Sequence, residues 1–213
     1  MQATYDPRVF YVNDIPSAMR IILTPEGTTT ENRWRIETPY VADLIAKSIE
    51  ITADTILIDY GCGIGRLAKE LIARHGCRVI GVDISPSMRA LAVIYVQSDR
   101  FSCCAPTMLD ALIERGFRSD AAISVWVLQH CADPAEDMTR LRRVIKPQGR
   151  LFILNNDVRA VPTVERGWFN DGIDIKAMLS REFALIESDR PMLDRTSKPI
   201  ASTTFWASFE QRP

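Results

Sequence analysis

The sequence lacks the marks of membrane, secreted and nucleic-acid-binding proteins. Its formal net charge is only −1, so no overall charge attracts nucleic acid or an anionic membrane. No apolar run approaches the roughly 18–20 residues of a membrane span. Residues 1–8 lack the basic and then apolar pattern of a secretory signal. We therefore expect a cytoplasmic protein with neither a membrane nor a nucleic acid as partner.

Metal-binding and nucleophilic side chains are scarce. There are two histidines, and the cysteines are odd in number and lack metal-type spacing: Cys62, Cys77, Cys103, Cys104 and Cys131. An odd set without such spacing favours reduced thiols over disulfides or a zinc site. We expect no metal centre.

What is present describes one soluble domain of ordinary size. The chain has 213 residues, of which 46% are apolar, enough for a sizeable core. We expect residues 1–50 to form an irregular lead-in with a cap helix that begins at Pro39. We expect residues 51–213 to form the main domain.

Strand-like and helix-like segments alternate from residue 55 onward, which is typical of parallel βαβ units in a doubly wound α/β sheet. Ligands of such sheets bind beyond the carboxyl ends of the strands. Asp59 and Asp83 end expected strands, and the pair Gln129-His130 follows another. The sequence therefore predicts that these residues border a common site.

A glycine-rich turn is the strongest local signal. Gly61, Gly63 and Gly65 follow the strand 55–59 and precede a helix-like stretch. Glycines allow positive φ and leave room for a ligand, and the helix start favours an anion. Asp83, after the next strand, is placed to accept ribose hydroxyls. Arg66 occupies the third-glycine position of the dinucleotide pattern, which disfavours NAD.

Four segments together resemble the class I S-adenosylmethionine-dependent methyltransferases: residues 59–66, 81–88, 124–134 and 141–154. The small-molecule group with the ubiquinone/menaquinone-pathway methylases is the most similar. The resemblance implies a Rossmann-like, seven-stranded, mostly parallel sheet of order 3-2-1-4-5-7-6, with strand seven antiparallel and an N-terminal helical cap. It also implies S-adenosylmethionine as cofactor and S-adenosylhomocysteine as product.

The resemblance assigns a cofactor role to ten residues. The backbone of the turn faces the methionine part, Asp59 orders the turn and the amino group, Asp83 holds the ribose, and two residues flank the adenine. The residues are Asp59, Gly61, Cys62, Gly63 and Gly65 at the turn, Asp83, Ile84 and Met88 at the nucleoside, and Leu128 and Gln129 beside the methyl group.

One departure concerns the third strand. Many members carry an acidic residue near its end for the adenine amino group, whereas this chain has Cys103-Cys104-Ala105-Pro106. The sequence leaves three alternatives open: backbone groups take that role, Asp110 takes it, or the affinity for the cofactor is modest.

The acceptor side is less defined. His130 is the candidate general base by residue type, although in the resembling family this segment more often orders the next turn. We expect Trp34, Arg35, Trp168 and Phe169 to contact substrate, with Tyr5, Phe10, Tyr11 and Tyr40 as further candidates. The loop 156–172 is expected to act as a lid.

The function expected is methyl transfer to an O, N or C atom of a small-molecule acceptor by in-line displacement, in a monomer or homodimer. A non-catalytic cofactor-binding partner subunit is the alternative reading. An NAD-dependent oxidoreductase is a remote one.

Overall fold

A seven-stranded sheet forms the centre of the protein. The computed structural model describes residues 3–212. The sheet has the order β3-β2-β1-β4-β5-β9-β8. The strands are β1 Ile56–Tyr60, β2 Arg78–Val82, β3 Phe101–Cys104, β4 Ser119–Val125, β5 Ile145–Asn156, β8 Ala184–Asp189 and β9 Thr204–Glu210. Strands β1 to β5 pair in parallel, and β9 is antiparallel to both neighbours. Since β8 and β9 are the sixth and seventh strands of this sheet, the expected order is confirmed.

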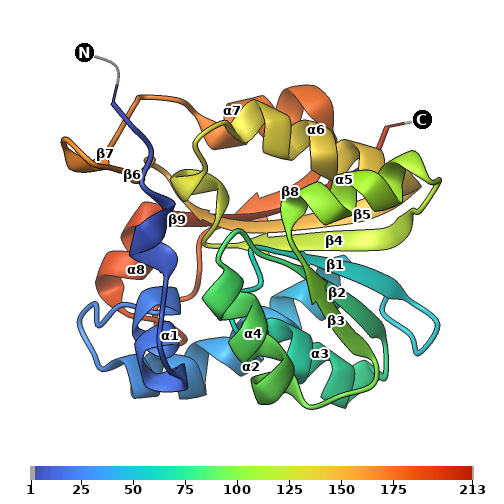
Figure 1. Ribbon diagram of the computed structural model, residues 1–213, viewed down its shortest axis with the longest axis horizontal. Coiled ribbons are helices and arrows are strands. Elements are labelled where there is room, and N and C mark those ends of the chain that lie inside the picture. Colours follow the sequence, from blue (N-terminus) through green and yellow to red (C-terminus); the bar gives the residue numbers. More distant parts are fainter. Residues whose placement is uncertain (1–2, 213) are drawn as a thin grey trace.

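Helices cover both faces of the sheet (Figure 1). Helices α2 Thr30–Ser48, α3 Arg66–His75 and α4 Pro86–Val96 lie on one face, and α5 Pro106–Glu114, α6 Pro134–Val144 and α7 Ile175–Glu182 lie on the other. Each face has its own apolar core. Phe152 of β5 belongs to the core under α2 and α3, and Ile153 to the core under the opposite helices. This alternation buries the central strands on both sides, as their near-continuous apolar sequences predict.

The helices α4 and α6 begin where the sequence places a cap. The Ser85 hydroxyl accepts from the Met88 N–H at 3.3 Å, and the Asp133 carboxylate accepts from two first-turn N–H groups of α6. A proline follows each cap, where its missing N–H carries no penalty. These caps fix the residues just upstream, Asp83 and His130, at the carboxyl ends of β2 and β4.

The N-terminal region is more helical than expected. It contains a short 3-10 helix, η1 Pro7–Phe10, and the helix α1 Ile15–Ile22, which the irregular reading of residues 1–30 missed. Helix α2 is continuous across Pro39 and is capped by Thr29, so the prediction of a helix beginning at Pro39 was wrong. Helix α8 Lys198–Thr203 precedes β9 and was also not predicted.

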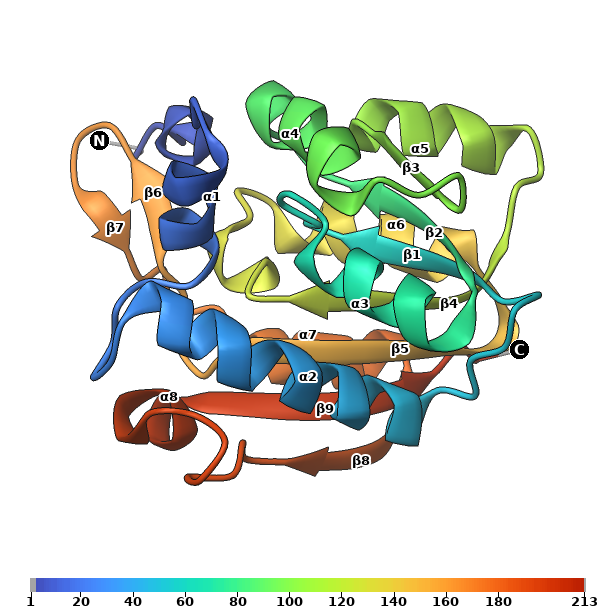
Figure 2. The same cartoon turned by 90° about the horizontal axis from the view of Figure 1, so that it is seen from below.

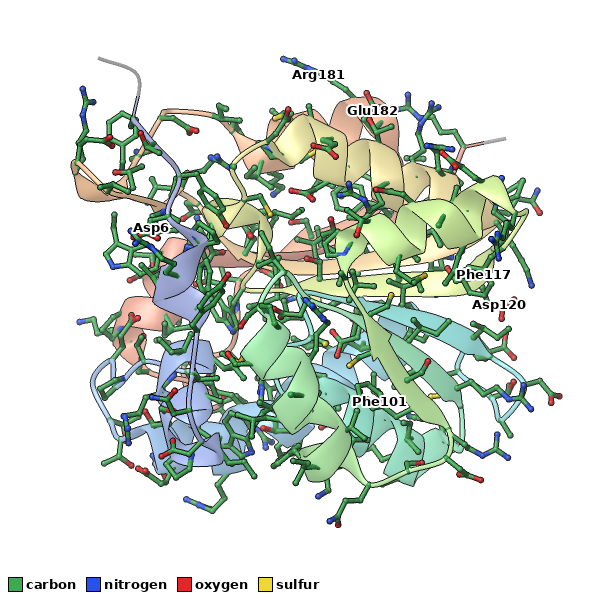
Figure 3. All side chains as sticks on the ribbon, viewed as in Figure 1. Asp6, Phe101, Phe117, Asp120, Arg181 and Glu182 are labelled. Carbon is green, nitrogen blue, oxygen red and sulfur yellow. The ribbon has the colours of Figure 1, made fainter. Side chains whose placement is uncertain are left out.

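The N-terminal segment pairs with the expected lid loop, residues 156–172. This loop contains a hairpin of β6 Val161–Thr163 and β7 Gly167–Phe169. Tyr5 forms a bridge with Thr163, and the Asp6 N–H donates to the Pro162 carbonyl at 3.0 Å. Figure 2 shows the hairpin beside α1, at one end of the sheet. In Figure 3, Asp6 lies at this end, and Phe117 and Asp120 lie at the opposite one.

None of the helices in residues 3–212 is long and apolar enough to cross a membrane. All five cysteines carry free thiols.

Candidate functional site

A cavity of about 790 Å³ opens at the carboxyl ends of the central strands. The glycine turn after β1, Asp83 after β2 and His130 after β4 all line it. The N-terminal segment and the hairpin supply its outer wall through Phe10 and Trp168. The structure thus brings together the strand ends that the sequence singled out.

The glycine turn lies in close contact with the cavity wall. Gly61 and Gly63 both adopt positive φ and both line the cavity. A Cβ on Gly61 would lie 2.1 Å from Val127 Cγ2, and one on Gly63 would lie 2.6 Å from Ile22 Cδ1. Val127 and Ile22 also line the cavity, so the turn packs directly against two side chains of the cavity wall, and a side chain at either glycine would displace them.

The turn satisfies its own N–H groups. Gly61 and Cys62 donate to the Val82 carbonyl at 2.6 and 3.1 Å, and Gly63 donates to Asp83 Oδ2 at 2.8 Å. These three N–H groups therefore hold the shape of the turn and are not free for a ligand. Asp83, which follows β2, is the main polar side chain beside the turn that can face a ligand.

Asp83 is fixed and nearly buried, yet it reaches the cavity. Its Oδ1 accepts from the Ser85 N–H at 2.8 Å, opposite the bond from Gly63 to Oδ2. Burial raises the pKa of Asp83, and these two backbone bonds and the nearby Arg89 oppose that rise. A carboxylate has about four lone-pair sites, so each oxygen retains one for a ligand hydroxyl.

Asp59 lies behind the turn and does not line the cavity. Its Oδ2 has no hydrogen-bond partner within residues 3–212, and burial raises the pKa of Asp59 to about 7. The buried Arg66 guanidinium and the Ala68 N–H oppose this rise. Arg66 donates to Thr38 Oγ1 at 3.1 Å, and burial lowers its pKa to about 10. Asp59 therefore faces Arg66 and the first turn of α3, away from the cavity.

The other expected cofactor residues divide into two sets. Ile84, Met88 and Gln129 line the cavity. The remaining three lie behind its surface: Cys62 and Leu128 are buried, and Gly65 caps α3 with a positive φ.

His130 is held by hydrogen bonds at both ring nitrogens. It lies in the short helix η2 Leu128–His130. Its Nδ1 is 2.6 Å from the Ala160 carbonyl, so Nδ1 carries the proton. Its Nε2 is 3.1 Å from Nε2 of Gln129. The Gln129 Oε1 accepts from the Asn156 N–H at 2.9 Å, which makes the Gln129 amide nitrogen a donor to His130. Burial lowers the pKa of His130.

Three aromatic rings from distant segments meet at the cavity mouth. The His130 ring lies 5.2 Å from Trp168 and 5.9 Å from Phe10, centroid to centroid, and Phe10 lies 6.2 Å from Trp168. Tyr5 lines the cavity nearby. This wall thus contains three of the residues that the sequence predicts as acceptor contacts: Tyr5, Phe10 and Trp168.

The other five expected acceptor residues do not line the cavity. Tyr11 is exposed, and the Tyr40 hydroxyl accepts from the Met192 N–H at 2.9 Å. Trp34 donates to the Tyr95 hydroxyl and packs under Arg66. Arg35 is exposed and donates to Asn32, and Phe169 packs against Arg166. Arg33 lines the cavity instead. The buried positions of α2 recur as Arg33, Glu37, Val41 and Ile45, so one unbroken helical phase through Pro39 would have identified Arg33.

A polar wall on α6 was not predicted. Arg140 is 7% exposed and binds Asp110 at 2.7 and 3.0 Å. It also donates to Tyr60 and Asp137 at 2.8 and 2.9 Å. The Tyr60 hydroxyl donates to Asp137. Because these side chains come from α5, α6 and β1, only the assembled fold shows that they meet.

The arginines that line the cavity are already engaged. Arg33 binds Glu37 through two hydrogen bonds of 2.7 and 2.9 Å. Arg140 binds the carboxylates named above. Arg89 donates to the backbone carbonyls of Asp83 and Ile84 at 2.6 and 3.1 Å. The described walls of the cavity therefore offer little positive charge to an anionic acceptor.

Comparisons with known proteins agree with this architecture. Residues 58–153 match the family model of the methyltransferase domain. A ubiquinone biosynthesis O-methyltransferase of Cereibacter sphaeroides is 35% identical over 97 residues, which is 45% of this chain and 39% of that protein. One from Xylella fastidiosa is 31% identical over 120 residues, 54% of this chain and 47% of that protein. The chain thus spans less than half the length of these relatives.

Solved structures share the fold at low identity. The PH0226 protein from Pyrococcus horikoshii superposes with a TM-score of 0.63 at 18% identity, over 91% of this chain and 96% of that one. The N-methyltransferase NodS from Bradyrhizobium japonicum, in complex with S-adenosylhomocysteine, gives 0.62 at 16% identity, over 84% and 92%.

Proposed function

We propose that this chain is a class I S-adenosylmethionine-dependent methyltransferase that transfers a methyl group from that cofactor to a small molecule; the match of residues 58–153 to the methyltransferase-domain family supports this. The observation that carries the proposal is the cavity at the strand ends, bordered by a side-chain-free turn and the fixed carboxylate of Asp83. Its volume lies in the range of pockets that hold small ligands, roughly 300–1,000 Å³.

The residues present fit this cofactor. Asp83 retains a lone pair on each oxygen for the two ribose hydroxyls, and Ile84 and Met88 offer apolar surface to the base. Gly61 and Gly63 line the cavity with backbone alone, where the methionine part would lie. Behind this surface lie four further residues: Asp59, Cys62, Gly65 and Leu128. Gln129 lines the cavity after β4.

The cofactor supplies a sulfonium methyl that is already activated for displacement. The chain's contribution is to align the acceptor with it and to exclude water. Phe10, Trp168 and Tyr5 form the apolar and aromatic wall suited to this. His130 holds the β4 end and the hairpin together through the Ala160 carbonyl, and we assign it a positioning role.

The acceptor is proposed to be a neutral, flat molecule with a hydroxyl group. The cavity arginines are engaged by carboxylates or carbonyls, which disfavours an anion. The aromatic wall favours a planar ring. The curated relatives are named O-methyltransferases, which supports oxygen over nitrogen or carbon as the methylated atom.

Calorimetry tests the cofactor part directly. The protein is expected to bind S-adenosylmethionine and S-adenosylhomocysteine and not to bind NAD. Asp83→Ala should weaken cofactor binding at least tenfold, because charge-assisted hydrogen bonds are lost. The control is Asp43→Asn, whose side chain is 67% exposed and pairs with Arg74 far from the cavity. Binding of NAD alone would overturn the proposal.

Turnover separates an enzyme from a cofactor-binding partner subunit. Incubation with radiolabelled S-adenosylmethionine and a panel of phenols should release S-adenosylhomocysteine. If the protein alone binds the cofactor tightly without turnover, and turnover appears only when a second chain is added, the partner-subunit alternative is favoured.

A further inference from the structure

Trp126 adopts a backbone conformation that is unfavourable for a bulky residue. It follows β4 directly and has a positive φ of 64°. A bulky side chain is strained in this left-handed region and is rarely found there. Within residues 3–212, the other non-glycine residues with positive φ are two exposed glutamines, Gln97 and Gln148. Trp126 is therefore the one aromatic residue held in this conformation in the described part of the chain.

The indole N–H of Trp126 adds a second cost. Its Nε1 atom is buried and has no hydrogen-bond partner within residues 3–212. A buried donor without a partner destabilises the folded state. The indole of Trp34, by contrast, donates to the Tyr95 hydroxyl at 3.2 Å. Backbone and hydrogen-bonding preferences thus both disfavour tryptophan at position 126.

The strained residue lies where the chain leaves the sheet. Its backbone N–H still donates to the Leu154 carbonyl at 2.8 Å, so the hydrogen bonding to β5 extends to this residue. The Trp126 side chain packs against the apolar core under α2 and α3. The next side chain, Val127, packs against the core on the opposite face and against the Gly61 turn. The left-handed turn therefore sends two successive side chains to opposite faces.

Trp126 lines the cavity next to α2 and remains partly exposed. The guanidinium carbon of Arg33 lies over its ring, 6.0 Å from the centroid. Arg33 lines the cavity as well, and it donates to the Thr24 carbonyl at 2.7 Å. Since β1 lies between β2 and β4 in the sheet, Trp126 is one strand removed from Asp83, at the nucleoside side. The indole thus belongs to the part of the wall that the N-terminal helices complete.

A residue that occupies the wall of a site despite two local costs indicates a role in that site. We infer that the indole of Trp126 is the surface against which the ring of a planar acceptor packs. This rests on the proposed function, because it takes the cofactor to be bound at Asp83 and the acceptor to be flat and neutral. Contact with the indole grows with the area of the acceptor ring, so Trp126 selects larger planar acceptors over smaller ones.

Titrations with phenol and 2-naphthol test this assignment. Both probes are neutral, flat and hydroxylated, and they differ by one fused ring. Each is titrated into protein saturated with S-adenosylhomocysteine, and binding is followed by ligand-observed NMR. We expect the wild-type protein to bind 2-naphthol about tenfold more tightly than phenol, because the second ring adds apolar contact.

Variants at position 126 isolate the contribution of the ring. Trp126→Gly removes the indole and relieves the strain, because glycine accepts a positive φ. It should reduce the preference for 2-naphthol to about threefold or less and keep the affinity for S-adenosylhomocysteine within about threefold of wild type. Trp126→Asn, which also tolerates this conformation, should behave alike and covers the case in which the glycine variant does not fold.

Two conservative variants complete the set. Trp126→Phe keeps an aromatic ring and should keep most of the preference. The matched control is Trp34→Phe, since Trp34 is also partly buried but does not line the cavity. It should keep the wild-type preference.

The indole N–H resonances give a direct signal. The chain has four tryptophans, and the resonance that is absent from Trp126→Phe identifies Trp126. Addition of 2-naphthol should shift this resonance through the ring current of the ligand and leave that of Trp34 in place.

The outcomes separate the two proposals. If wild-type protein binds S-adenosylhomocysteine but Trp126→Gly keeps the wild-type preference, the role of Trp126 is overturned and the cofactor part of the proposed function stands. An unshifted Trp126 resonance, or no binding of 2-naphthol to the wild-type complex, has the same meaning. If wild-type protein does not bind S-adenosylhomocysteine, the proposed function itself fails, and this inference fails with it.

Discussion

Replacing Gly61 by alanine tests the central feature of the site. Alanine at position 61 would have to adopt a positive φ of 78°. Its Cβ would lie 2.1 and 2.6 Å from the two γ-carbons of Val127. A left-handed conformation costs a residue with a Cβ about 1–2 kcal/mol. Displacing a packed side chain costs about 1–3 kcal/mol. We expect Gly61→Ala to lower the free energy of unfolding by about 2–5 kcal/mol, measured by urea denaturation with tryptophan fluorescence.

Two further variants separate these contributions. Gly116 has a similar φ of 88°, but a Cβ added there would meet nothing within 4 Å, so Gly116→Ala should show the backbone cost alone. Val127→Ala in the Gly61→Ala background should recover the overlap part and give a coupling of about 1 kcal/mol or more. If Gly61→Ala costs no more than Gly116→Ala, or if the two sites do not couple, the turn does not pack against Val127 as described.

Two other residues give predictions of a different kind. Asp59 has a pKa raised from 3.8 to about 7 by burial, so the folded state holds a proton that the unfolded chain releases above pH 4. The free energy of unfolding should therefore fall by about 4 kcal/mol between pH 4 and 8 through this group. Asp59→Asn should remove that decline. Parallel curves of stability against pH for the two proteins would contradict this. His130→Ala should change cofactor affinity less than threefold and turnover about tenfold or less, because general-base catalysis would contribute roughly 10²–10⁴; a thousandfold fall in turnover with loss of the acid limb of the pH profile would identify His130 as the base.

The cofactor side of the site was largely predictable from the sequence. Gly61, Gly63 and Asp83 lie within one strand–turn–helix–strand unit, where glycine spacing and the offset to the acid determine the geometry locally. The sheet order followed from the resemblance and was confirmed. Local signals sufficed because these residues are close in the chain as well as in space.

The remaining walls depend on contacts between distant elements. Pro39 suggested a helix boundary, yet α2 continues through it, and Arg33 of this helix lines the cavity whereas Trp34 and Arg35 do not. Arg140 sits among charged neighbours that resemble a solvated surface. Only the packing of α5, α6 and β1 shows that its guanidinium is surrounded by Asp110, Tyr60 and Asp137. Single-chain patterns carry no record of such tertiary neighbours.

The N-terminal segment pairs with the β6–β7 hairpin, and the two sides of the site therefore differ in how easily they can open. The nucleoside side is built into the central strands, whereas the acceptor side is joined by the Tyr5–Thr163 bridge and by the exposed bonds of Thr4 to Glu165 at 2.7 and 2.8 Å. Such a junction can open by local unfolding at a small fraction of the global free energy. Acceptor entry and product exit therefore need not disturb the bound nucleoside. Substitutions in either paired segment can also alter acceptor preference while the cofactor surface is retained.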